Sequence, residues 1–219
     1  MTTPGSWGYP QQQYGSPPYG QPHYPPQQPP PAHYGAPQPN YAAPQQLPPA
    51  GPEESPAVQA YLAAVAQHMS MGGLQVSRNW LGPVLSLIGV GAVIKSALNP
   101  IELAVCVGHA GEISPATVAG FTRQVDEFAR SIRRPSAFVV KGGACAVAAL
   151  LSDRVHPASF AAVTNKAMSY GTVVVPAVID LTNRRILIAQ NTPMLGLALW
   201  STVRGKAATY LPDPRAVLG

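Results

Sequence analysis

Apolar residues recur at helical spacing most regularly between residues 115 and 134. One face of the helix predicted there carries Val118, Phe121, Val125, Phe128 and Ile132. Ser114-Pro115 precedes this face, and a capping hydroxyl followed by proline is typical of a helix start. The same signal at Ser55-Pro56 opens a second predicted helix, which the glycine pair at 72–73 ends. We therefore expect two well-marked amphipathic helices.

Short apolar runs between polar loops predict strands. The runs 103–108 and 137–140 flank the helix at 115–134, and a strand, helix and strand in this order indicate a βαβ unit with parallel strands. Residues 173–181 and 185–189 predict a β-hairpin that turns at Thr182-Asn183. Pro176 lies inside the first strand of this hairpin, which favours a sheet edge or a bulge at that point.

The remaining elements are less regular. Residues 74–76 predict a short strand, and alanine and leucine favour a helix over a strand at 144–153. Further helices are expected at 157–169 and from Thr192-Pro193 onward. The predicted fold class is α/β with a central mixed sheet, a βαβ unit and a C-terminal β-hairpin followed by a helix.

The most apolar stretch of the chain is residues 80–94, WLGPVLSLIGVGAVI. It contains Pro83 and three glycines, and its length falls below the roughly 17 to 20 apolar residues that a membrane-spanning helix needs. We therefore expect buried core in strand or hairpin form, and insertion into a membrane is the alternative.

The N-terminal segment differs sharply from the rest. Residues 1–52 contain no Asp, Glu, Lys or Arg and alternate proline, glycine and glutamine with six tyrosines. Proline at this density blocks helices, and the lack of aliphatic residues leaves no core, so the segment is expected to be disordered. The predicted organisation is a low-complexity tail over residues 1–54 and a single α/β domain over residues 55–219. The tail is either a spacer or a modulator of association through tyrosine–arginine contacts.

The domain itself is poor in charge. Residues 57–219 hold 14 basic and 7 acidic side chains, which is about half the usual share of roughly 25%. A surface this neutral favours contact with a second copy, a protein partner or a membrane surface. Nucleic-acid binding is not expected, because the arginines form short pairs, such as Arg133-Arg134 and Arg184-Arg185, rather than a stripe with aromatic residues.

Both cysteines, Cys106 and Cys145, lie in apolar runs and are expected to be buried free thiols. The first residues, MTTPGSWGYPQQQ, have neither a basic nor an apolar region of a signal peptide. Both observations indicate a cytoplasmic protein.

No established catalytic, nucleotide-binding or metal-binding motif is present, so neither a cofactor nor a metal is expected. The best-placed candidates for a ligand site are His109, Glu112 and Lys141, which follow two predicted strands of the sheet. Ligands of open α/β sheets bind beyond the carboxyl ends of the strands. There His109 would be a base, Glu112 would orient it and Lys141 would hold an anion.

The C-terminal helix offers a surface for contact with a partner or a membrane. The candidate residues on it are Trp200, Met194, Leu197 and Arg204. From the low charge and the missing motifs, the predicted function is a non-catalytic interaction or assembly protein. A peripheral membrane protein using residues 80–94 or this helix, and a ligand-binding or hydrolytic enzyme, remain as alternatives.

Overall fold

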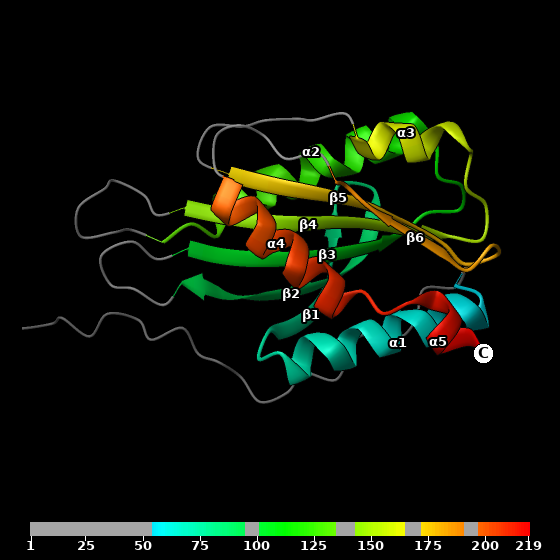
Figure 1. Ribbon diagram of the computed structural model, residues 1–219, viewed down its shortest axis with the longest axis horizontal. Helices are drawn as coiled ribbons and strands as arrows, with labels where there is room; N and C mark the ends of the chain where they lie inside the picture. Colours follow the sequence, from blue (N-terminus) through cyan, green and yellow to red (C-terminus); the bar gives the residue numbers. More distant parts are fainter. Residues whose placement is uncertain (1–53, 95–100, 135–142, 165–171, 191–196) are drawn as a thin grey trace, which may run out of the picture. The chain divides into compact units, whose positions relative to one another are not determined.

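Six strands form one mixed sheet whose spatial order is the order of the chain (Figure 1). The computed structural model describes residues 54–94, 101–134, 143–164, 172–190 and 197–219. The strands are β1 (Gln75–Leu81), β2 (Val84–Ile94), β3 (Ile101–His109), β4 (Gly143–Ser152), β5 (Thr172–Asp180) and β6 (Arg185–Ile188). Strands β3, β4 and β5 are parallel, whereas β1, β2 and β6 pair antiparallel with their neighbours. The predicted α/β class with a mixed sheet is confirmed.

Helices cover both faces of this sheet. Their bounds are α1 (Pro56–Met71), α2 (Pro115–Ser131), α3 (Ala158–Thr164), α4 (Leu197–Tyr210) and α5 (Pro214–Leu218). The crossovers through α2 and α3 advance the sheet in the same direction, and right-handed crossovers then place both helices on one face. Helices α1 and α4 pack against the other face, and α5 packs against α1 (Figure 1).

The two predicted helix starts are confirmed. The Ser55 hydroxyl accepts a hydrogen bond from the Val58 N–H at the start of α1. At α2, the Ser114 hydroxyl accepts from the Thr117 N–H while the Thr117 hydroxyl accepts from the Ser114 N–H. These reciprocal bonds form a capping box, which satisfies two donors that the helix itself leaves unpaired.

The expectation of a helix at 144–153 was wrong, because these residues form most of β4. The strand lies between β3 and β5, and its residues from Ala144 to Ser152 are all buried. A strand covered on both faces needs apolar residues at every position, so it loses the alternation that identifies strands in a sequence. The strand predicted at 137–140 lies outside the described residues.

Residues 80–94 belong to a β-hairpin, as expected. β1 turns into β2 through Gly82, whose φ of +59° suits the first central position of a tight hairpin turn. Leu87 and Ile88 of β2 are 1% and 2% exposed and belong to the core. Among the described residues, no helix is long and apolar enough to cross a membrane.

Two glycines of β2 let α1 and the residues after it approach the sheet closely. A Cβ atom on Gly89 would lie 2.8 Å from Sδ of Met69, and one on Gly91 would lie 2.6 Å from Cδ2 of Leu74. Such distances are shorter than van der Waals contact. Gly89 and Gly91 therefore serve the close packing of α1 and Leu74 on the sheet.

The predicted C-terminal hairpin is confirmed as β5 and β6. Their ladder runs from Asp180–Arg185 to Ala177–Ile188, and the Ala189 N–H then donates to the Pro176 carbonyl oxygen. Pro176 therefore lies where the pairing of β5 with β6 ends, a position that tolerates the missing N–H of proline. Of the tail predicted over residues 1–54, residues 1–53 lie outside the described residues, and Glu54 is described.

Candidate interaction site

Two residues of the predicted ligand site, His109 and Glu112, lie in the described part of the fold. His109 is the last residue of β3 and is partly buried, whereas Glu112 lies in the following loop and is exposed. Lys141 lies outside the described residues. It precedes Gly143, which pairs with Ile101 at the opposite end of β3 from His109. The strand pairing therefore gives no support to a site that joins His109 and Lys141.

The loops at the carboxyl edge of the parallel strands use many of their polar groups to hold one another. The Ile113 N–H donates to the Arg154 carbonyl oxygen at 2.9 Å, and the His156 N–H donates to the Ile113 carbonyl oxygen at 2.9 Å. The Arg154 Nε–H also donates to the Gly111 carbonyl oxygen at 3.2 Å. Within the described ranges, no three His, Cys, Asp or Glu side chains gather where they could hold a metal ion.

Two of the arginines at the end of α2, Arg130 and Arg134, are engaged in ion pairs. Arg130 lies 2.5 Å from Asp126, and Nε of Arg134 lies 2.9 Å from Oε1 of the buried Glu102. These pairs tie the helix end to itself and to β3. They account for part of the basic cluster without a nucleic-acid partner.

The two buried thiols have raised pKa values, and the Tyr61 hydroxyl is hydrogen-bonded. Burial raises the pKa of the Cys145 thiol to about 12 and moves the pKa of Cys106 higher still. Both thiols are therefore protonated near neutral pH, where a nucleophilic cysteine would need to be a thiolate. The Tyr61 hydroxyl donates to the Pro212 carbonyl oxygen at 2.8 Å, which joins α1 to the chain just before α5.

The predicted contact surface on α4 can be followed only in part. Met194 lies outside the described residues, and the side chains of Leu197 and Trp200 are likewise not described. Arg204 donates from Nη1 to the Gln190 carbonyl oxygen at 3.2 Å, so it fastens α4 to the end of the β5–β6 hairpin. The prediction of a partner surface on this helix stays a prediction.

Two large hydrophobic side chains are exposed among the described residues: Met71 at 79% and Trp80 at 63%. Trp80 on β1 pairs with Leu85 on β2. Ser86 on β2 pairs with Gly108 on β3, so the next residue of β3, His109, lies opposite Leu85. Because side chains alternate along a strand, Trp80, Leu85 and His109 point to the same face, the one that α1 covers. We call these three residues the rim row.

Gly108 of β3 shows which face of the sheet His109 occupies. A Cβ atom on Gly108 would meet the ring of Phe121, so Gly108 faces α2 and its neighbour His109 faces the α1 side. Leu85 and His109 are both partly buried, and Trp80 forms the exposed end of the row. The row thus presents an indole, an aliphatic side chain and an imidazole on three successive antiparallel strands, with no charged residue among them.

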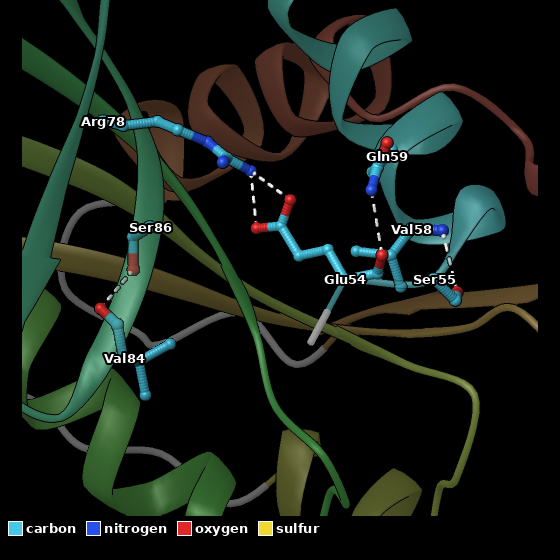
Figure 2. Close-up of polar contacts among 7 residues, drawn as sticks. All are labelled: Glu54, Ser55, Val58, Gln59, Arg78, Val84 and Ser86. Atoms are coloured by element: carbon cyan, nitrogen blue, oxygen red, sulfur yellow. Dashed lines mark hydrogen bonds and ion pairs between the residues drawn. The ribbon is translucent and has the colours of Figure 1, made fainter. Parts of the chain in front are cut away.

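A buried ion pair borders the rim row. Arg78 lies two residues before Trp80 and on the same face, and its Nη2 donates to both carboxylate oxygens of Glu54 at 2.7 and 2.9 Å (Figure 2). The two side chains are only 7% and 5% exposed. Glu54 lies two residues before the first residue of α1, so this pair fixes the start of the described domain against the edge strand.

Ser55 is held from the other side. Its hydroxyl donates to Oδ2 of Asp153, 3.0 Å away in the loop after β4, while it also caps α1. The chain therefore enters the domain between β1 on one side and the end of β4 on the other. The rim row lies beside these two anchors, on β1, on β2 and at the end of β3.

Sequence reasoning missed both the ion pair and the exposed tryptophan. The apolar run 80–94 predicts a core position for Trp80, and the strand predicted before it ends at residue 76. A signal was present: Arg78 and Asn79 within QVSRNWL are unlike a core strand and typical of an edge.

Comparisons of this chain with protein-family models, with curated proteins and with solved structures gave no match.

Proposed function

We propose that this chain is a non-catalytic cytoplasmic assembly protein whose α/β domain associates with another protein molecule, in the first place a second copy, through the rim row. The observation that carries the proposal is the 63% exposure of Trp80 at the end of a row that is otherwise directed toward the core. Tryptophan is strongly enriched among the residues that dominate protein–protein binding.

The charge pattern supports the same proposal. The domain carries about half the usual share of charged side chains, and several of these are used internally, as in the Arg78–Glu54 and Arg134–Glu102 pairs. A neutral, partly apolar rim costs little to desolvate when it is covered by a partner. The two free, buried thiols accord with a reducing compartment.

The test is the mass of the full chain measured by light scattering after size exclusion, over a wide range of concentrations. We expect the mass to rise above 22.9 kDa with concentration. Trp80→Ser should raise the concentration of half-association at least tenfold, because central interface tryptophans contribute about 2 kcal/mol or more. Met71→Ser is the matched control, since Met71 is more exposed than Trp80 but lies outside the rim row.

Two results would contradict the proposal. If the wild-type chain stays at the monomer mass at every concentration, it does not self-associate. If Trp80→Ser and Met71→Ser shift association equally, association takes place but the rim row is not its surface.

A further inference from the structure

The sheet has two outermost strands, β1 and β6, whose outer sides pair with no other described strand (Figure 1). The open side of such a strand presents backbone N–H and C=O groups, onto which a strand of another molecule can add. β6 is well suited to this addition, because Ile186, Leu187 and Ile188 are apolar and only partly buried. The fold therefore has two edges at which the sheet could be extended.

The pairing of β6 with β5 shows which of its backbone groups point outward. The Ala189 N–H donates to the Pro176 carbonyl oxygen at 3.0 Å, so the backbone of Ala189 faces β5. Because backbone groups alternate in direction along an antiparallel strand, those of Ile186 and Ile188 point away from the sheet. The outward carbonyl oxygen of Ile188 accepts a hydrogen bond from Nε2 of Gln190 at 3.1 Å. One of the two outward residues of β6 is thus occupied by a side-chain amide of the chain itself.

A matching contact lies on β1, at the other edge. Leu81 and Val84 pair across a two-residue turn, so the backbone groups of Leu81 face β2. By the same alternation, the backbone groups of Trp80 point outward. The Trp80 N–H donates to Oδ1 of Asn79 at 2.8 Å. A side-chain amide therefore occupies an outward donor on β1 and an outward acceptor on β6.

These two contacts oppose the addition of a strand. An added strand forms a continuous ladder, in which the outward N–H and C=O groups of the edge pair with the new strand. Where an amide already occupies the group, the new strand must displace it or leave one of its own backbone groups buried and unpaired. β1 has seven residues and β6 has four, so one lost position removes a large share of either ladder.

We propose that the side-chain amides of Asn79 and Gln190 are edge guards, which keep the sheet from being extended by an edge strand of a second copy. An edge guard is a side chain that occupies an outward backbone group of its own edge strand. This inference does not rest on the function proposed above. It concerns the backbone edges of β1 and β6, whereas that function concerns the side chains of the rim row.

The test uses the full chain and removes the guards with Asn79→Ala, with Gln190→Ala and with both substitutions together. Gln75→Ala is the matched control. It also removes an amide from an exposed position on an edge strand, but within the described ranges the Gln75 side chain makes no hydrogen bond.

The measured quantity is the rate at which single backbone N–H groups exchange with D₂O, followed by NMR at several protein concentrations. The reporters are the outward N–H groups of Val76 on β1 and Ile186 on β6, which an added strand would protect. The N–H of Leu187 faces β5 and is the internal reference, because its slow exchange in every variant shows that the fold is intact.

In the wild type and in Gln75→Ala, we expect the exchange of both reporters to be independent of protein concentration. In Asn79→Ala the exchange of Val76 should slow as the concentration rises, and in Gln190→Ala that of Ile186 should slow. The expected change is about tenfold at the highest concentration, because the added strand no longer leaves a backbone group unpaired.

The inference is overturned if the double variant exchanges like the wild type at every concentration, or if Gln75→Ala slows the exchange as much as Asn79→Ala. Concentration-dependent protection in the wild type would also overturn it, since the edges would then be open despite the amides. Light scattering on the same samples separates this inference from the assembly function. A wild type that stays at the monomer mass, with constant exchange, contradicts assembly while it agrees with the guards.

Discussion

At the scale of single residues, the Arg78–Glu54 pair shows how the domain tolerates charge inside a largely neutral molecule. Both side chains are buried, and the two hydrogen bonds from one guanidinium nitrogen keep the carboxylate satisfied. A buried pair of this kind contributes little net stability compared with apolar residues of the same size. Its removal from one side, however, leaves an uncompensated charge.

The first prediction follows from that asymmetry. Glu54→Gln should lower the free energy of unfolding by about 3 kcal/mol, because the buried Arg78 would lose the charge of this carboxylate. The double variant Glu54→Leu with Arg78→Met should recover most of the loss. Urea unfolding followed by circular dichroism measures both values, and a double variant as unstable as Glu54→Gln would contradict the reasoning.

A second prediction concerns glycine at the close approach of α1 to the sheet. Gly91→Ala should cost about 1–3 kcal/mol of stability, because its Cβ atom would lie 2.6 Å from Cδ2 of Leu74. Gly143→Ala is the control, since the same atom there would meet Ile101 Cγ1 at an ordinary 3.6 Å. Equal stabilities of the two variants would show that Leu74 moves aside without cost.

At the scale of elements, the capping box of α2 connects a sequence signal with a measurable stability. The Ser114 and Thr117 hydroxyls satisfy two backbone donors, and Ser114 follows directly on Ile113, which bridges to Val155. The cap therefore also sets the direction in which α2 leaves the carboxyl edge of β3.

We predict that Ser114→Ala lowers the free energy of unfolding by about 1 kcal/mol, the usual effect of removing an N-cap hydroxyl. Ser70→Ala provides the comparison, because Ser70 is exposed near the end of α1 and alanine is the better helix former. Chemical denaturation measures the free energy of unfolding of both variants. A Ser114 variant as stable as the wild type would mean that the Thr117 hydroxyl or water replaces the cap.

The elements with local signals were predictable from the sequence. Capping residues marked α1 and α2, and a turn between two apolar runs marked β5 and β6. The failure at β4 came from tertiary context, since a strand between two others, covered on both faces, carries no alternation that distinguishes it from a helix. The exposure of Trp80 was hidden from the sequence for a related reason. Trp80 reads as core by its neighbours, and only its place on the outermost strand exposes it.

At the scale of the whole molecule, burial of ionisable groups makes stability depend on pH. The folded state raises the pKa of Cys145 to about 12 and raises those of Cys106 and Tyr61 as well. A group whose folded pKa lies above its unfolded value stabilises the fold below the unfolded pKa. That stabilisation is lost as the pH rises toward the folded value.

The fourth prediction is therefore a fall in stability above about pH 8.5, where the unfolded thiols begin to ionise. Each thiol should contribute a slope of about 1.4 kcal/mol per pH unit in this range. Cys145→Ala should reduce the slope between pH 9 and 11 by one such contribution, whatever its effect at pH 7. Unfolding curves at half-unit pH steps measure it, and an unchanged slope would show that Cys145 ionises equally in both states.

The agreement between strand order and chain order has a consequence for how the molecule is made. Among the described strands, each one from β2 onward pairs with the strand that precedes it in the chain, so the sheet can grow one strand at a time as synthesis proceeds. Sequential pairing of this kind closes short loops and favours rapid folding. α1 is the exception: the hydroxyl of Tyr61 finds its acceptor at Pro212, 151 residues later. Of the described helices, α1 is synthesised first and can pack on β1 and β2 early, but its contacts with α4 and α5 form only once residues 197–218 have been synthesised.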